Sequence, residues 1–284
     1  MKHRWSGMRI APSACSAAIS AVLMASPVFG ADEPGVSPPP VAAPTVATES
    51  QREAATLLQG MAKYLAGLKA FTVNVRSGYD VVQSTGHKIE FGESRVVTMA
   101  RPDRFRVEEV ASDGTRDLAL FDGRTLTVMN ADSNVYAQAP QPGSVDDALV
   151  YFVRDLRMRM PLALLMTTRL PDELPQRVKS IDYVEGSDID GVPVHHLAGR
   201  SESVDFQFWI TQGERPLPLR VVLTYRNETG QPQYWANFAQ WNAAPQIAAD
   251  VFKFTRPPDA RQIPFAVQRL QPAGPAKATG EITP

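Results

Sequence analysis

The side chains that could carry out acid–base or metal chemistry are few, and their spacing does not bring them together. His195 and His196 are neighbours on a predicted strand, as are Glu108 and Glu109, and neighbouring strand residues point to opposite faces of a sheet. The histidines therefore do not chelate one metal ion, and the glutamates do not act as acid and base on one substrate. The stretch from Asp188 to Asp190 resembles a calcium loop but lacks the remaining ligands. We expect no catalytic residue, no metal site and no cofactor, and predict that the protein is not an enzyme.

Charge and cysteine content narrow the class of protein further. The sequence has 29 Lys and Arg against 30 Asp and Glu, a balance that gives no electrostatic case for binding nucleic acid. Cys15 is the only cysteine of the sequence and lies in a segment that we expect to be removed. We therefore expect neither a disulfide nor thiolate chemistry, and the folded part must rely on its hydrophobic core.

The N-terminus has the pattern of an export signal. Lys2, Arg4 and Arg9 form a basic start, and a small, apolar stretch follows over residues 10–24. This stretch, about 15 residues long, is too short to cross ~30 Å of hydrocarbon, so a cleaved signal is favoured over an uncleaved tether. Composition then divides the chain into a signal peptide at 1–31, a proline-rich linker at 32–49, a folded domain at 50–259 and a disordered tail at 260–284.

Helices are predicted at the front and in the middle of the folded domain, and strands elsewhere. Apolar residues over 54–68 follow helical spacing behind a cap at Thr48 or Ser50, and Ser144 begins a second helix that a short one at 161–166 follows. Alternating segments predict about eleven antiparallel strands. They lie at 71–82, 88–100, 105–111, 116–121, 125–130, 135–138, 178–185, 192–199, 204–211, 219–226 and 233–242, with a last strand containing Phe252 and Phe254.

The three strands over residues 204–242 form a meander with one strongly apolar face. Strict alternation puts Phe206 and Phe208 on this face. In the third strand it puts Tyr234, Ala236 and Phe238 on one side, and Trp235 and Trp241 on the other. We therefore predict a face that must be covered and an opposite face that carries tryptophans.

Several motifs resemble a known family. They are Tyr79-Asp80-Val81-Val82, Arg101-Pro102-Asp103, Asp205-Phe206-Gln207-Phe208-Trp209-Ile210, Arg215-Pro216-Leu217-Pro218-Leu219-Arg220 and Trp241-Asn242. With them, residues 54–258 resemble the bacterial family of predicted periplasmic proteins called domain of unknown function 2092 (DUF2092). More distantly, the chain is similar to the lipoprotein-carrier and lipoprotein-receptor superfamily of the Gram-negative envelope. These resemblances imply a periplasmic protein built as a single incomplete, strongly curved antiparallel β-barrel, mainly β with helices that plug or cap an apolar interior.

An apolar ligand would lie against the inward-facing residues of such a half-barrel. The candidates for ligand binding are apolar residues of three predicted strands: Phe71, Val73, Val75, Phe206, Phe208, Leu219, Val221 and Leu223. The same side chains would also make a solid core if the first helix filled the barrel completely. Sequence alone leaves these two alternatives open.

Two functions follow from the resemblance and the residue patterns. The leading one is a non-catalytic periplasmic protein that holds a lipid, a lipoprotein acyl chain or another apolar ligand. The alternative is an envelope protein-interaction or sensing module with a filled core, whose tryptophans meet a protein partner. A cavity left beside the helices would favour the first function, and an exposed aromatic patch would favour the second. For either function we expect neither a nucleic-acid partner nor a stable membrane span.

Overall fold

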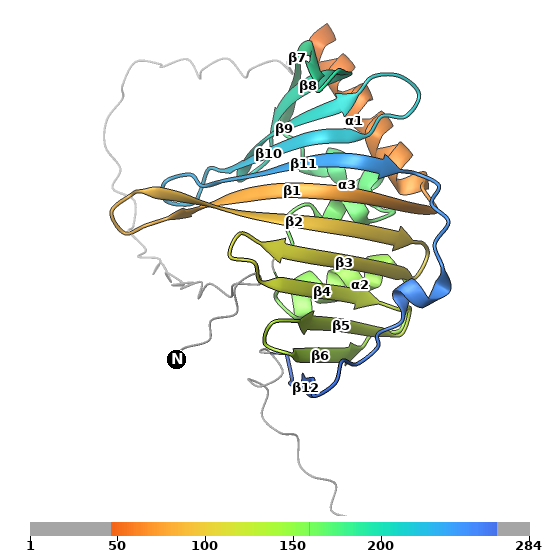
Figure 1. The fold of residues 1–284 in the computed structure, drawn as a ribbon. Helices are drawn as coiled ribbons and strands as arrows, with labels where there is room; N and C mark the ends of the chain where they lie inside the picture. Colours follow the sequence, from red (N-terminus) through yellow and green to blue (C-terminus); the bar gives the residue numbers. More distant parts are fainter. Residues whose placement is uncertain (1–46, 159, 266–284) are drawn as a thin grey trace, which may run out of the picture.

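Strands dominate the fold and form one mixed sheet that is not closed into a barrel (Figure 1). The computed structural model describes residues 47–158 and 160–265, so the predicted signal peptide, nearly all of the predicted linker and residues 266–284 lie outside the described residues. The sheet order is β12-β6-β5-β4-β3-β2-β1-β11-β10-β9-β8-β7. The strands are β1 (Ala70–Val82), β2 (Lys88–Ala100), β3 (Arg104–Ala111), β4 (Arg116–Phe121), β5 (Thr125–Asn130), β6 (Val135–Pro140), β7 (Ser180–Ile189), β8 (Val192–Arg200), β9 (Val204–Thr211), β10 (Pro218–Tyr225), β11 (Gln233–Asn242) and β12 (Arg261–Gln262).

Two meanders, β1 to β6 and β7 to β11, are joined into this single sheet by the antiparallel pairing of β1 with β11. The short strand β12 runs parallel to β6, which makes the sheet mixed. The prediction of a mainly β protein with helices is therefore confirmed. The last predicted strand is wrong, because Ala249–Phe252 form a 3-10 helix, η3, and Phe252 is buried.

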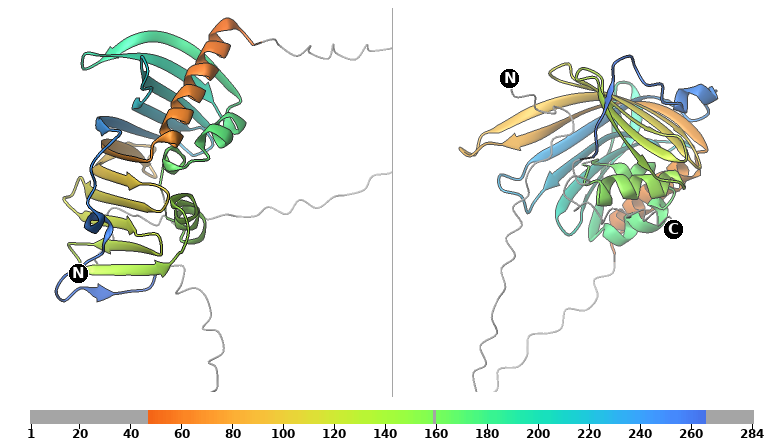
Figure 2. Two further views of the ribbon diagram at one scale, coloured as in Figure 1. Left: turned by 90° about the vertical axis from the view of Figure 1, so that its right-hand side faces the viewer. Right: turned by 90° about the horizontal axis from the view of Figure 1, so that it is seen from below.

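Apart from η3, the helices lie on one face of the bent sheet (Figure 2). They are α1 (Glu49–Gly67), α2 (Val145–Val150), the π-helical turn η1 (Tyr151–Asp155), the 3-10 turn η2 (Ala163–Met166) and α3 (Leu170–Arg177). Helix α3, which contains Pro171 and Pro175, was not predicted from the sequence. None of the helices in the described part of the chain combines the length and the apolar character that a bilayer crossing requires.

Helix α1 covers the second meander. Thr48 caps it, because its hydroxyl accepts a hydrogen bond from the Gln51 backbone while the Gln51 side chain accepts one from the Thr48 backbone. The apolar stripe buries Leu58, Met61 and Leu65 in a core shared with Phe206, Phe208, Ile210 and Val221. Burying a side chain of this size stabilises the fold by about 1.5–3 kcal/mol. The predicted front helix is therefore present, and it covers the inner face of strands β7 to β10.

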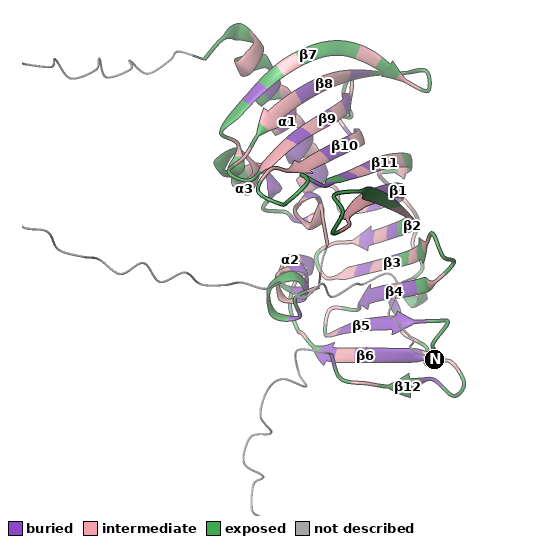
Figure 3. Cartoon of the chain, turned by 90° about the vertical axis from the view of Figure 1, so that its left-hand side faces the viewer, coloured by how far each residue is buried: buried purple, intermediate pink, exposed green. Residues whose placement is uncertain are grey.

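The C-terminal segment covers the opposite face of the first meander (Figure 2). Phe254 packs against Tyr136 and Met129, which point away from the helices. With α2 on the other side, strands β4 to β6 are buried on both faces (Figure 3). The tail predicted from residue 260 begins with β12, and Phe265 is buried in the core beside the helices.

The outer face of the second meander carries a ladder of stacked side chains, each from a different strand. His196 stacks on Trp209 with 4.1 Å between ring centroids. The Arg220 guanidinium lies 5.6 Å from the Trp209 ring and 5.8 Å from the Trp235 ring. The Trp235 indole in turn donates a hydrogen bond to Glu90 at 3.0 Å. These contacts within the chain occupy the two tryptophans on this face.

Replacing Gly78 by alanine is expected to disturb this ladder. A Cβ atom at Gly78 would lie 2.7 Å from the Trp235 ring, so the indole must move. We expect Gly78→Ala to lower the free energy of unfolding by roughly 1–3 kcal/mol, as overpacked sites do. Urea denaturation measures this loss, and Gly92→Ala is the matched control. Gly92 pairs with Gly78 across β1 and β2, yet a Cβ there meets nothing closer than 3.8 Å. Equal losses in the two variants would contradict the packing argument.

Candidate functional site

A cavity of about 100 Å³ lies between the middle of the sheet and the helical segments. The sheet side comes from six strands, and the facing side from the end of α1, from η1 and from residues 160–166. Its lining residues are Leu65, Phe71, Val73, Val75, Arg95, Val97, Val107, Glu109, Asp117, Ala119, Phe152, Met160, Pro161, Leu162, Leu165, Met166, Pro218, Tyr234, Phe238 and Trp241. Most of these residues are apolar. The helices therefore leave an apolar cavity beside the sheet and do not occupy the whole space against its inner face.

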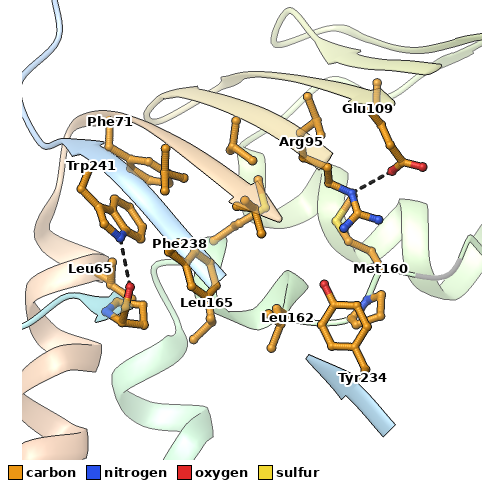
Figure 4. A pocket seen from close by; sticks show the side chains of 18 of the residues that line it. Leu65, Phe71, Arg95, Glu109, Met160, Leu162, Leu165, Tyr234, Phe238 and Trp241 are labelled. Carbon is orange, nitrogen blue, oxygen red and sulfur yellow. Dashed lines mark hydrogen bonds and ion pairs between the residues drawn. The ribbon is translucent and has the colours of Figure 1, made fainter. Parts of the chain in front are cut away.

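Three aromatic rings form one end of the cavity (Figure 4). Trp241 lies 5.6 Å from Phe71 and 5.9 Å from Phe238, measured between ring centroids. Its indole donates a hydrogen bond to the carbonyl of Pro218 at 3.0 Å, which satisfies the one polar atom of the ring. This end offers a rigid apolar surface.

The position of Trp241 corrects the prediction that it shares a face with Trp235. Asn74 pairs with Ala239 and Thr72 with Asn242, so β11 carries one extra residue in this stretch. Gln240 has a φ of 54° at this irregularity. One inserted residue moves every later side chain of the strand to the other face. Trp235 therefore lies on the outer face and Trp241 in the cavity.

The other end of the cavity is polar and crosses the strands as a row. Arg95, Glu109 and Asp117 occupy directly paired positions on β2, β3 and β4. The Arg95 Nε atom donates to Glu109 Oε2 at 2.7 Å, and Arg95 Nη2 lies 2.6 Å from Glu93 Oε1. Asp117 accepts a hydrogen bond from Asn130 at 2.8 Å. The Arg95 guanidinium thus lies between the carboxylates of Glu109 and Glu93, at the edge of an otherwise apolar cavity.

Burial shifts the ionisation of this row. It raises the pKa of Glu109 to about 7 although Arg95 beside it acts in the opposite direction, and Glu93 adds to the rise. Burial also raises the pKa of Asp117, against the effect of the hydrogen bond from Asn130. One guanidinium does not fully compensate the neighbouring carboxylates, so a proton binds here more readily than at an exposed carboxyl group.

Arg101 holds the helical wall of the cavity against the sheet. Its guanidinium donates to the carbonyl of Leu65 at 3.2 Å and to that of Met166 at 2.8 Å. The same group lies 5.7 Å from the Phe71 ring. Arg101 directly follows β2, so it ties the last turn of α1 and the end of η2 to the end of that strand. This contact sets the spacing between the two walls.

The predicted ligand-binding residues separate into two groups. Phe71, Val73 and Val75 line the cavity, as predicted residues. Trp241 and the polar row also line it, although they were not among the predicted ligand-binding residues. The other five lie elsewhere: Phe206, Phe208 and Val221 are buried beneath α1, Leu223 packs at the edge of both cores, and Leu219 is the extra residue of an irregularity in β10. Ligand contact by all eight remains a prediction.

The histidines lie away from the cavity and from each other. His195 approaches the Tyr183 hydroxyl at 3.4 Å, whereas His196 stacks on Trp209 on the outer face. Glu108 and Glu109 diverge in the same way, since Glu108 pairs with Arg106 and Glu109 with Arg95. In residues 47–158 and 160–265, no three His, Cys, Asp or Glu side chains gather as a metal site would require.

Comparisons with known proteins give one family and several distant structural likenesses. The family described as predicted periplasmic protein (DUF2092) matches residues 54–266, well over half of the chain. No curated protein matches the chain. The periplasmic location predicted from the sequence agrees with this family match.

Solved structures similar to this chain include three proteins of low sequence identity. An uncharacterized conserved protein from Thermus thermophilus has a TM-score of 0.45 and 13% identity, covering 75% of this chain and 99% of that one. LprF from Mycobacterium bovis has a TM-score of 0.44 and 14% identity, covering 74% and 98%. A LolA superfamily protein, NE2245 from Nitrosomonas europaea, has a TM-score of 0.37 and 12% identity, covering 71% and 97%. Likenesses of this size carry no argument about what the present chain binds.

Proposed function

We propose that this chain, which belongs to the DUF2092 family of predicted periplasmic proteins, binds an apolar ligand between its sheet and its helices without catalysing a reaction on it. The observation that carries the proposal is the oily cavity that remains after the helices are in place. Lipids, lipoprotein acyl chains and similar molecules are the ligand class. In this proposal the curved, unclosed sheet acts as a half-barrel and the helices as its plug.

The energy gained by burying a whole acyl chain is large. A 16-carbon chain exposes about 15 methylenes to water, and burying each gains ~0.8 kcal/mol, so full burial is worth roughly 12 kcal/mol. An acylated molecule that crosses the periplasm needs a container for this surface. We also propose that residues 1–31 are a cleaved signal peptide that directs export and that residues 32–49 are a proline-rich linker ahead of the folded domain.

The size of the cavity limits how a long chain enters. A dry cavity of about 150 Å³ holds a benzene molecule, so the space of about 100 Å³ here takes only part of an acyl chain. We expect the segment around Pro161 to be the part of the cavity wall that moves. Leu162 has a φ of 65°, a left-handed conformation that costs a leucine free energy, so a change of conformation there would release strain. Movement of this segment away from the sheet would lengthen the cavity.

The alternative function, a protein-interaction module that presents its tryptophans, has less support. Trp209 and Trp235 are engaged by Arg220 in the outer ladder, and Trp241 lines the cavity. Each ring thus packs against neighbours in the same chain. The remaining cavity favours ligand binding.

A cavity-filling substitution tests the proposal. Ala119 is 7% exposed and lines the cavity, so Ala119→Leu places three more carbons in the space that a ligand would occupy. We expect the mature protein to bind the neutral fluorescent probe N-phenyl-1-naphthylamine with the segment around Pro161 moved away from the sheet, and Ala119→Leu to weaken this binding at least about tenfold, or ~1.4 kcal/mol. Fluorescence titration measures the affinity.

Ala131→Leu is the matched control for this titration, because Ala131 is an exposed turn residue outside the cavity. It should bind the probe as the unmodified protein does. Absence of probe binding by the unmodified protein, or equal weakening in the two variants, would count against a ligand site at the cavity.

A further inference from the structure

The polar end of the cavity contains an acceptor atom without a partner. Glu109 uses Oε2 to accept from Arg95 at 2.7 Å, while its Oε1 atom is buried and has no hydrogen-bond partner among the described residues. A buried acceptor left in this state costs free energy that a donor supplied by a ligand would recover. Since Glu109 lines the cavity, a bound molecule can reach this carboxyl group.

The guanidinium in the same row is already committed. Arg95 Nε donates to Glu109, Nη1 donates to Ser77 at 3.1 Å, and Nη2 lies 2.6 Å from Glu93. Each of its three nitrogen atoms therefore faces an acceptor within the protein. A ligand carboxylate or phosphate would have to share this guanidinium with the carboxylates of Glu93 and Glu109.

The charges at the polar end of the cavity also disfavour an anion. Of the described residues that line it, Arg95 carries the one positive charge, and Glu109 and Asp117 carry carboxyl groups. Glu93 stands behind Arg95 as a third carboxyl group, with an exposed fraction of 8%. An anionic head group would meet like charges in a region of low polarity, where repulsion is weakly screened.

We propose that the ligand's apolar part lies toward Trp241 and Phe71, and that its polar end is a hydrogen-bond donor, a hydroxyl or an ammonium group, which bonds to Glu109. This inference rests on the proposed function and specifies its ligand class. The two ends lie on opposite sides of the cavity (Figure 4), so one molecule can contact both. Free fatty acids and acyl phosphates are then poor ligands.

The raised pKa of Glu109 fits this role, because such a carboxyl group changes its charge near neutral pH. The charged groups that face it are Arg95 and Glu93 on β2 and Asp117 on β4. Tyr234 on β11 faces Arg95 instead. At pH 8 the ionised form predominates, and this form attracts an ammonium group most strongly.

Three ligands with the same eight-carbon chain test the inference at pH 8. Octylamine, octanol and octanoate are titrated against the mature protein by displacement of N-phenyl-1-naphthylamine. We expect octylamine and octanol each to bind at least about tenfold more tightly than octanoate. This ranking needs no variant and does not depend on the stability of a mutant.

Glu109→Gln then assigns the preference to a residue. It retains the size of the side chain and removes its charge, so octylamine should lose about tenfold in affinity while octanol changes by less than about threefold. Glu108→Gln is the matched control, because Glu108 directly precedes Glu109 on β3 and has its side chain on the outer face. It should alter neither affinity, and thermal melts establish that both variants are folded.

Failure of this inference differs from failure of the proposed function. If the neutral probe binds but octanoate binds as tightly as octanol, or Glu109→Gln acts no differently from Glu108→Gln, the head-group preference is wrong and the apolar site stands. If neither the probe nor any eight-carbon ligand binds, the proposed function is wrong and this inference falls with it.

Discussion

Phe208→Asp is expected to leave the protein unfolded at 25 °C. Phe208 is 4% exposed and packs beneath α1, with its ring 5.9 Å from that of Phe206. Loss of a buried aromatic side chain costs about 3–5 kcal/mol. An unpaired carboxylate in the same place adds several kcal/mol more. The sum approaches the whole stability of a typical domain, about 5–15 kcal/mol.

The neighbouring residue provides the control. Gln207 points to the outer face, where its side-chain oxygen lies 3.0 Å from His196 Nε2. Gln207→Asp gives up this contact, worth about 1 kcal/mol, and should remain folded. Thermal melts followed by circular dichroism measure both variants. Equal destabilisation would show that the assignment of the two faces of β9 is wrong.

The alternation of apolar and polar residues was sufficient to predict most of the sheet. Strands β1 to β11 lie close to their predicted ranges, and the front helix begins at the predicted cap Thr48. These elements repeat one simple pattern over many residues, so local sequence determines them. The segment around Phe252 and Phe254 shows the same alternation, but it crosses the outer face of the first meander and does not pair as a strand.

Trp241 shows where the alternation fails. A single inserted residue at Gln240 reverses the face of everything after it, and nothing in QYWANFAQWN marks that position. The irregularity depends on how β11 meets β1, which is a property of the pair of strands. Consequently, the alternation pattern predicted that Trp241 lies on the outer face, whereas its ring lines the cavity.

The polar row left a signal in the sequence. Glu93 and Arg95 occupy the same alternating positions as Val97 and Met99, so charged side chains continue the apolar row of β2. A charged pair on the inward row of a strand indicates either a buried ion pair or a strand end that reaches solvent. Only the pairing of β2 with β3, which sets Arg95 opposite Glu109, distinguishes the two.

Arg95→Met is expected to cost about 3–5 kcal/mol at pH 8, because it leaves buried carboxylates without their partner. Glu93 and Glu109 both lose a contact shorter than 3 Å, and the methionine supplies only apolar surface. Arg106→Met is the control. Arg106 forms an ion pair with Glu108 at 2.8 Å on the outer face, and exposed pairs contribute about 0–1 kcal/mol. Urea denaturation measures both losses.

The pH dependence of stability separates a charge effect from a packing effect. The pKa of Glu109 is raised in the folded protein to about 7, so its contribution to stability is present below about pH 4.5 and is lost as the pH rises toward 7. Without Arg95 the folded-state pKa should rise further, and the deficit of Arg95→Met should therefore shrink on acidification from pH 8 to pH 5. Adding Glu93→Gln and Glu109→Gln to Arg95→Met should recover most of the loss at pH 8. A deficit that is independent of pH and unaffected by these two changes would mean that Arg95 stabilises the fold through packing, and that the carboxyl groups of the row do not depend on its charge.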